Sequence, residues 1–565
     1  MSVIGVLKNG KPGARPVDEI PPFVRLFPLG LQHVLAMYAG AVAVPLIVGG
    51  AMAGAGQLES GDIVHLIMAD LFVAGIATIL QAVGFWRFGV RLPLMQGVTF
   101  AAVGPMITIG TSYGITAIYG SVIACGLFMI AVAPVVGRLI RFFPPLVTGT
   151  IILIIGVSLM RVAAGWFGGG TAAGPDFGDP KDIGFGFLTL AIIVAIERFA
   201  PDALRRVSIL LGLVIGTLVS IPFSMTNWDK IGEYPWVGVP QPFQFGAPTF
   251  EISAIISLLI VGLVIMTETT GDIVAVGEIV DEKITPRRLA DGMRADGLGT
   301  LLGGIFNTFP YTAFAQNVGL VAITGVRTRH VATCAGIILV VLGLLPKMAA
   351  VVEGIPLAVL GGAGVALFGM VAASGIRTLA KVKFNNVNVL VVAISVGVAM
   401  LTEAKIYYTD RSGDAPVDVV LDIYAEFPDW FQTIFHSGIS AGAITAILLN
   451  LLLNTRSVSS DPVDYHNTGD IAVVGTPPGL SASDGVRAPA FDPRDALAAA
   501  DPDTPPETLR YLADHDPSLH QFIVTNPSAP KDLCDEIREL GDPKVMRVFE
   551  AWDGKTEGKF SQRGS

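Results

Sequence analysis

Three carboxylates lie inside stretches of the chain that are otherwise apolar. They are Glu268, Asp272 and Asp296. The stretch that contains them ends in FNTFPYTAFAQNVGLVAITG at 306–325, where a polar segment with a proline lies between two hydrophobic segments. A carboxylate near the bilayer centre costs roughly 2.5 to 3.5 kcal/mol on insertion scales, so such residues persist mainly where they face a polar cavity. The pattern predicts a binding site within a membrane. A snorkelling, lipid-tolerated acid is the alternative.

Glu268 and Asp272 are four residues apart, which places both on one face of a helix. Two acids within reach of each other cannot both ionise cheaply, so the pair is a candidate proton carrier. Asp296, at the predicted start of the ninth span, is a second candidate for the coupling charge. His33 has the chemistry of a proton shuttle, although a lone histidine in a span is more often a packing or hydrogen-bonding group.

Carboxamides and a hydroxyl mark two places where a helix should break. Gln316 and Asn317 lie at the second break, and Gln96 and Thr99 hold the corresponding place in the first. A broken span frees backbone groups that must line a cavity or meet a ligand, and two half-helices direct their positive ends inward. Because a carboxamide complements the amide edge of a heterocycle, we expect a flat polar or anionic solute. Ordinary helix–helix hydrogen bonding is the alternative.

The composition is that of a membrane protein. Of 565 residues, 52% are hydrophobic and 15% are charged, with a mean hydropathy of +0.63, which is too apolar for a soluble globular protein. Taking about 20 apolar residues per helix, we predict an all-α polytopic protein. It has fourteen spans in two inverted seven-span repeats, with short β-like broken segments in spans 3 and 10. The predicted spans are 29–52, 63–86, 92–110, 115–136, 144–166, 182–200, 207–225, 252–277, 296–309, 310–325, 330–350, 355–376, 385–403 and 428–453.

The basic residues predict the orientation. Seventeen Lys and Arg residues flank the predicted spans on one side of the membrane and six on the other. Because the more basic side faces the cytoplasm, we predict that both termini are cytoplasmic. We expect a multi-pass protein of the cell membrane, that is, the inner or plasma membrane. Residues 1–25 are then a cytoplasmic segment and not a cleaved signal peptide. The three cysteines form no disulfide pattern and no metal-binding spacing. We therefore expect no metal and no cofactor apart from a co-transported proton or sodium ion.

The composition changes at about Arg456. Residues 457–565 hold ten Lys and Arg against nineteen Asp and Glu, so the acidity of the chain belongs to this tail. Residues 457–490 have the composition of a flexible linker. Within 491–565, TPPETL recurs as SAPKDL and DPSLHQF is echoed by DPKVMRVF, which resembles leucine-rich variant repeats with a proline opening each helix. We expect a small α-helical module that binds a cytoplasmic protein; an unstructured solubilising tail is the alternative.

The membrane part, from about Phe23 to Arg456, resembles the nucleobase-ascorbate transporter family (nucleobase:cation symporter-2). QNVGLVAITG at 316–325 fits the family signature, and QHVLAMYAGA at 32–41 resembles its first-span motif. TETTGD and QGVTFAAVGPM look most like bacterial uric acid and xanthine permeases. Where uracil transporters have Gly-Glu-Asn, this chain has Ala315 before Gln316 and Asn317, which favours an oxidised purine over a pyrimidine.

The resemblance implies roles for the candidate residues. Glu268 and Gln316 would hydrogen-bond the purine, Asn317 would shape the site, and Thr99 would favour urate over xanthine. The remaining residues, Asp296, Asp272 and His33, would support the site or the coupling.

The resemblance also implies an architecture for 26–456. A core of spans 1–4 and 8–11 would move like an elevator against a gate of spans 5–7 and 12–14, in a homodimer surrounded by lipid.

Three functions are consistent with the residues. The first is a purine importer driven by cation symport; the pair of acids favours a proton as the cation, and sodium is the alternative. An inorganic anion transporter or channel of similar architecture is the second, and it predicts a cationic residue at the breaks. A membrane-embedded enzyme or sensor is the third, and it requires a nucleophile–base set or a metal cluster. Neither requirement is met in the sequence, so no enzyme and no nucleic-acid partner are expected.

Truncation after Arg456 should leave purine transport intact, because the tail lies outside the region that resembles the family. Uptake of radiolabelled urate by the truncated and full-length proteins, at matched amounts in the membrane, measures this. A truncated protein that inserts normally but no longer transports would show that the tail is regulatory.

Overall fold

The computed structural model describes the chain in two units, which divide between Val473 and Val474. The described residues of the first unit are 15–59, 61–136, 143–170, 177–404, 406–410, 417–421 and 426–454. Those of the second are 499, 501, 504–515, 519–526 and 528–540. The expected linker at 457–490, most of the segment 1–25 and the repeat DPKVMRVF lie outside the described residues.

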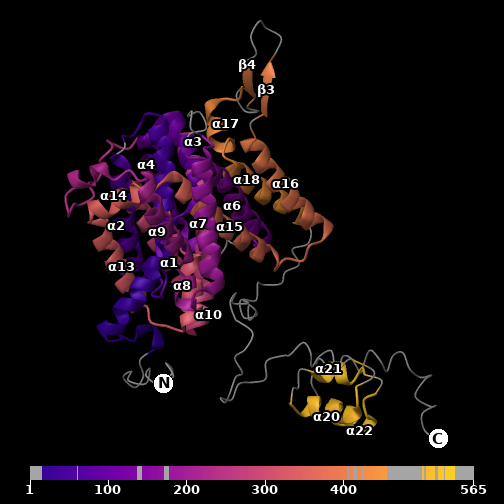
Figure 1. The fold of residues 1–565 in the computed structure, drawn as a ribbon. Coiled ribbons are helices and arrows are strands. Elements are labelled where there is room, and N and C mark those ends of the chain that lie inside the picture. The colour runs from indigo at the N-terminus through magenta and orange to yellow at the C-terminus, as the bar shows by residue number, and fades with distance from the viewer. Residues whose placement is uncertain are drawn as a thin grey trace. The chain divides into compact units, whose positions relative to one another are not determined.

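The first unit is a bundle of helices (Figure 1). Its first half contains α1 (Phe23–Gly54), α2 (Asp62–Val83), β1 (Gln96–Val98), α3 (Val103–Tyr113), α4 (Ile115–Val132), α6 (Pro145–Phe167), α7 (Pro180–Phe199), α8 (Asp202–Arg205) and α9 (Ser208–Ser220). Short 3-10 helices are η2 (Pro16–Asp18), η3 (Phe100–Ala102), η4 (Ala133–Val135), η6 (Ile221–Phe223) and η7 (Asp229–Glu233).

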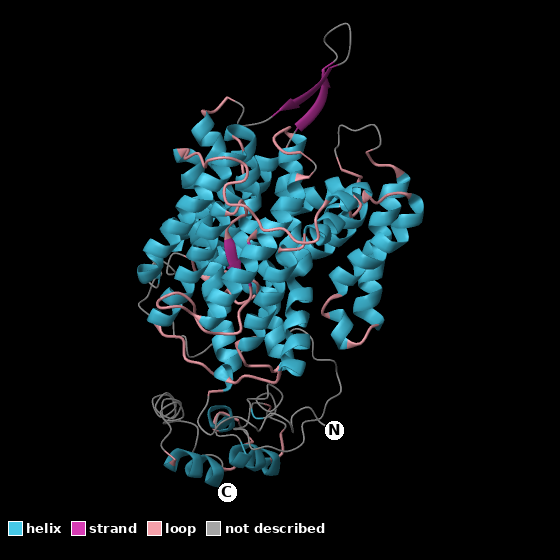
Figure 2. Ribbon diagram, turned by 90° about the vertical axis from the view of Figure 1, so that its left-hand side faces the viewer, coloured by secondary structure: helices cyan, strands magenta, loops and turns pink. Residues whose placement is uncertain are grey.

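Its second half repeats the order of long helices and short strands. The elements are α10 (Ile252–Val280), α11 (Pro286–Ile305), β2 (Tyr311–Ala313), α12 (Ala315–Thr324), α13 (His330–Gly343), α14 (Pro346–Glu353), α15 (Leu357–Leu379), α16 (Asn386–Glu403), β3 (Ile406–Asp410), β4 (Val417–Leu421), α17 (Asp429–Phe435) and α18 (Gly438–Asn454). Figure 2 shows one strand pair among the helices, while the β3–β4 hairpin projects beyond them.

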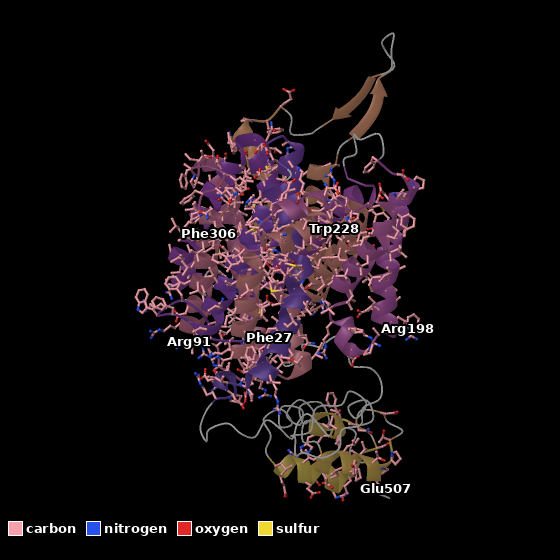
Figure 3. The ribbon with its side chains drawn as sticks, turned by 60° about the vertical axis from the view of Figure 1, so that its left-hand side comes forward. Phe27, Arg91, Arg198, Trp228, Phe306 and Glu507 are labelled. Atoms are coloured by element: carbon pink, nitrogen blue, oxygen red, sulfur yellow. The ribbon has the colours of Figure 1, made fainter. Side chains whose placement is uncertain are left out.

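Several helices are long and apolar enough to cross a membrane. Among the described residues six meet this criterion, and α13 with α14, bent by 82° at their junction, would make a seventh. Shorter apolar helices lie at Ser208–Phe223, Ala315–Thr324, Asn386–Thr402 and Gly438–Asn454. The chain is thus a mostly helical, multi-pass membrane protein, and the count of fourteen spans in two inverted repeats stays a prediction. Arg91 and Arg198, both assigned to the inner side, lie at the same end of the bundle (Figure 3).

One sequence-based boundary was wrong, and one predicted span is bent. The ninth span was expected to begin at Asp296, but α11 begins ten residues earlier, at Pro286. Pro286 occupies the first helical position, and Thr285 caps the helix by accepting a hydrogen bond from the Arg288 N–H (3.2 Å). Asp296 therefore lies in the middle of α11. The predicted span 330–350 is also not one straight helix, because it bends between α13 and α14.

The helices pack mainly within two sets. In one set, α13 packs on α1 and α2, and α11 packs on α2 and α4. In the other, α15 packs on α6, α7 and α9, and α18 packs on α6 and α16. The division of the spans into a core and a gate, and their relative movement, stay predictions.

The crossing of α4 and α11 depends on glycine. A Cβ added to Gly126 would lie 2.5 Å from the Leu301 nitrogen and 2.7 Å from the Gly297 oxygen, and one added to Gly297 would lie 2.9 Å from the Gly126 oxygen. Small residues at such crossings let two backbones approach closely, which is how helices associate where lipid removes the hydrophobic drive. Because α11 carries Asp296, this contact also helps to set the position of that carboxylate.

The second unit has its own small core. Its helices are α20 (Pro506–His515), α21 (His520–Ile523) and α22 (Lys531–Glu539). Leu509, Leu519, Ile523, Leu533 and Ile537 of these segments are buried against one another. These residues fold as helices that begin next to prolines, as the repeats TPPETL and SAPKDL predicted, so an unstructured tail is ruled out for them.

Gly126→Ala should destabilise the helical bundle, because the added methyl group meets the backbone of α11 rather than a movable side chain. Overpacking of this kind costs about 1–3 kcal/mol, and the melting temperature of the detergent-solubilised protein measures it. Gly50→Ala is the control, since nothing lies within 4 Å of its added Cβ. Equal melting temperatures for the two variants would contradict the prediction.

Candidate functional site

The two segments expected to break their helices pair with each other as strands. β1 and β2 are antiparallel, with Gln96 opposite Ala313 and Val98 opposite Tyr311. Two further backbone bonds extend the pair, from Phe314 N–H to Met95 O (3.0 Å) and from Thr99 N–H to Pro310 O (2.9 Å). Both strands are buried throughout. Their backbone groups therefore satisfy each other in a medium that offers no water.

A helix begins directly after each strand. Thr99 precedes η3 and α3, and its hydroxyl oxygen accepts a hydrogen bond from the Ala101 N–H (3.1 Å). Ala315 opens α12, so Gln316 lies in its first turn. The first N–H groups of a helix lack partners within the helix and carry the positive end of its dipole. Both ends of the strand pair thus lead into helix N-termini that favour a polar or anionic group.

Glu268 and Thr269 of α10 hold β2 from one face. The Thr269 hydroxyl accepts a hydrogen bond from the Ala313 N–H (3.2 Å) and lies 3.2 Å from the Thr312 hydroxyl. Thr312 in turn donates to the Glu268 carboxylate at 3.4 Å. Glu268 is only partly buried. Its carboxylate is therefore tied to the strand pair.

Three carboxyls lie close together beside the strands. Asp272 is one turn after Glu268 on α10 and is close enough to both Glu268 and Asp296 for mutual repulsion. Asp296 is fully buried, and its Oδ1 accepts a hydrogen bond from the Gln81 side chain (2.9 Å). Gln96 and Thr269 also lie next to this carboxyl. The described residues contain no group of three His, Cys, Asp or Glu arranged to hold a metal ion.

Several polar atoms here lack a protein partner. Among the described residues, these are Oδ2 of Asp272, Oδ2 of Asp296 and both carboxamide atoms of Gln96. A buried polar atom without a hydrogen bond costs about 1–3 kcal/mol. Such atoms beside the strand pair indicate a place that a proton, an ion or a solute could complete.

His33 and Asn317 form a separate link. The Asn317 carboxamide nitrogen lies 3.1 Å from Nδ1 of His33 and 2.9 Å from its carbonyl oxygen, and both side chains are buried. This contact attaches the start of α12 to α1. Gln316 and Ala315, by contrast, are exposed. Of the substrate-binding candidates, Gln316 is exposed and Glu268 is partly buried, whereas Asn317, Thr99 and Gln96 are buried.

A polar stripe on α2 holds residues that were not among the predicted site residues. Asp70, Thr78 and Gln81 are all completely buried and face the strands or α11. The Thr78 hydroxyl accepts a hydrogen bond from the Gln96 N–H (3.0 Å). Asp70 carries the same signal that identified Glu268, an acid inside an apolar span. Gln81 and Thr78 carry none, because uncharged polar residues are common in membrane helices.

A cavity of about 390 Å³ lies elsewhere, against α3 and α6. Ser158 of α6, Thr402 of α16, His436 and Ser437 contribute its polar lining. None of the predicted site residues lines it. The chemistry of the site therefore rests on the strand pair and not on this cavity.

Thr269→Val should weaken the attachment of β2 to α10, because it removes the acceptor of the Ala313 N–H. A buried N–H left without a partner costs about 1–3 kcal/mol, which should lower the melting temperature. Thr267→Val is the control, since the Thr267 hydroxyl bonds only to its own helix, at the Leu263 carbonyl. A variant as stable as this control would show that the hydroxyl does not hold the strand.

Comparison with known families identifies the two parts of the chain. Residues 24–406 match the sequence model of the Permease family that covers xanthine and uric acid permeases. Residues 493–551 match the Leucine Rich Repeat Variant domain. The second match agrees with the repeats predicted in the tail.

Comparison with individual proteins gives long alignments. The chain is 44% identical to a xanthine permease of Bacillus subtilis, over 77% of this chain and 95% of that protein. It is 41% identical to the uric acid transporter UacT of Escherichia coli, over 80% of this chain and 91% of that protein. The uric acid permease PucK of Bacillus subtilis is also 41% identical, over 77% and 97%.

Among solved structures, the transmembrane domain of the cyanobacterial bicarbonate transporter BicA is similar, with a TM-score of 0.49 and 18% identity over 67% of this chain and 96% of that one. A likeness of this size supports no conclusion on substrate. The sequence matches, in contrast, cover the strand pair and every candidate site residue. The chain belongs to the nucleobase-ascorbate transporter family of xanthine and uric acid permeases.

Proposed function

We propose that this protein is a secondary active transporter that imports an oxidised purine, urate or xanthine, by symport with a cation, and that the cation is a proton. The observation that carries the proposal is the placement of Gln316 and Glu268. Gln316 is exposed and Glu268 is partly buried, and they come from a helix N-terminus and from the helix that holds β2. The relatives, named as xanthine and uric acid permeases, support the purine class.

The two side chains complement a purine edge. A carboxamide donates and accepts one hydrogen bond each at an amide edge of the ring, and a carboxylate accepts from a ring N–H. The Thr312 hydroxyl, 3.4 Å from Glu268, orients that carboxylate. In this proposal Thr99 at the start of η3 biases the choice toward urate, and Ala315 leaves room beside the ring.

The charges near the strand pair disfavour an inorganic anion. The charged side chains that the structure places there are Glu268, Asp272, Asp296 and Asp70, all acidic. An anion site of the bicarbonate or chloride type would require a cation in their place. Repelling carboxyls instead favour uptake of a positive charge, which supports coupling to a proton.

The proposal includes the transport cycle expected from the resemblance. Fourteen spans in two inverted repeats, with both termini in the cytoplasm, would form a homodimer in which the core moves against the gate. The pairing of β1 with β2 supports it, because strand-then-helix units occupy matching places in the two halves. The two packing sets of helices support a division into core and gate.

Glu268→Gln should abolish uptake of radiolabelled urate while the protein remains in the membrane. Hydrogen bonds to charged groups contribute about 1.5–3 kcal/mol, so purine binding should weaken roughly 10- to 100-fold. Uptake in cells and binding to the purified protein measure the two effects. Glu278→Gln is the control, because Glu278 is an exposed residue of the same helix. Full uptake by the Glu268 variant would overturn the proposal.

A further inference from the structure

Asp70 is a carboxyl that the proposed purine site does not use. It lies within α2, in a helix apolar enough to span a membrane, and is completely buried. Tyr311 of β2 donates a hydrogen bond from its hydroxyl to Oδ1 of Asp70 (2.8 Å). The Thr308 hydroxyl is a second, longer donor to the same oxygen (3.3 Å). Among the described residues, Oδ2 of Asp70 has no hydrogen-bond partner.

Within the part of the chain that the structure describes, no cation neutralises this carboxyl. α1, α11, α13 and α14 pack against α2, and none of them brings a charged side chain to Asp70 among the described residues. Tyr311 is the titratable group that faces it. An isolated ionised carboxylate is expensive at this depth. Binding a proton removes that charge without any other ligand.

The geometry around Tyr311 accommodates Asp70 with and without a proton. The Tyr311 hydroxyl lies 2.8 Å from the side-chain Oδ1 of Asp70 and 2.9 Å from the backbone carbonyl oxygen of Asp70. With Asp70 ionised, the hydroxyl donates to Oδ1. With Asp70 protonated at Oδ1, the carboxyl donates to the tyrosine oxygen, and the tyrosine hydrogen turns to the carbonyl oxygen. A proton can therefore be gained or lost by rotation of one hydroxyl, with no movement of heavier atoms.

Tyr311 also connects Asp70 to the purine site. Successive side chains of a strand point to opposite faces, and Tyr311 and Thr312 are successive residues of β2. Tyr311 contacts Asp70 on one face, and Thr312 contacts Glu268 on the other. A shift of β2 at Asp70 would therefore also move the strand at Glu268.

We propose that Asp70 is a proton-binding site of the transport cycle, and that Tyr311 links its protonation to the strand that holds Glu268. This inference rests on the proposed function, since it assigns the coupled proton to a residue outside the purine site. Asp70 takes up a proton on the side where purine enters and releases it on the other side. The net result is one proton carried with the solute. A carboxyl that stays permanently protonated as a packing group is the competing structural role.

The test uses Asp70→Asn in full-length protein reconstituted into liposomes. Wild-type protein should accumulate labelled urate under an inward proton gradient and lose this accumulation on addition of a protonophore. The variant should still exchange labelled for unlabelled urate across the membrane but should not accumulate it. Asp62→Asn, at the start of the same helix, is the control and should accumulate urate normally. Normal accumulation by Asp70→Asn, or loss of exchange together with accumulation in a folded variant, would overturn the proposal.

Two further measurements cover the remaining outcomes. If Asp70→Asn fails to insert, Tyr311→Phe replaces it, because this variant keeps the aromatic ring and the Asp70 carboxyl. It should still exchange urate but accumulate less of it. Unchanged accumulation would refute the link between Tyr311 and the protonation of Asp70. Infrared spectra of the purified protein without solute should contain a protonated-carboxyl band that disappears as the pH rises and is missing in Asp70→Asn. The pH dependence of this band tests proton binding by Asp70 even if the wild-type protein fails to transport urate. Such a failure of transport would refute only the proposed function. A band that persists at every pH would identify the structural role.

Discussion

The antiparallel pairing of β1 with β2 is the interaction on which the rest of the site depends. A chain that leaves the helical conformation inside a membrane exposes N–H and C=O groups that lipid cannot satisfy. Here two such segments, more than two hundred residues apart, satisfy each other, with Gln96 opposite Ala313 and Val98 opposite Tyr311. Because each strand leads directly into a helix, the pairing also brings two helix N-termini to one place.

The strand pair divides the polar chemistry between its two faces. On one face, Thr312 and Thr269 connect β2 to Glu268, beside Asp272 and Asp296. On the other, Tyr311 connects the same strand to Asp70. Acids on both sides of a three-residue strand make its position sensitive to how many of them carry a proton. In the proposed cycle, a small shift of β2 would connect proton binding at Asp70 to solute binding at Glu268.

Buried and accessible residues have different tasks in this arrangement. Gln316 is exposed and Glu268 is partly buried, and both are the proposed solute contacts, whereas Asn317 is buried and attaches α12 to α1 through His33. Gln81 likewise acts behind the site, since its carboxamide donates to Asp296 and accepts from the Val90 N–H (2.9 Å). The tail adds a folded leucine-rich variant module with its own core, which is a separate unit of the chain.

The sequence alone determined the membrane class, the family, the places where the helices break and most of the polar residues around them. These follow from composition, apolar length and local motifs, which are properties of neighbouring residues. Only the tertiary structure decided that the two segments pair as strands and that Asp70 faces Tyr311. It also decided that Asp296 lies in the middle of α11 and accepts a hydrogen bond from Gln81 of α2. Those contacts join residues such as Asp70 and Tyr311, 241 positions apart, and hydrophobic periodicity carries no information about which distant helix a buried side chain will meet.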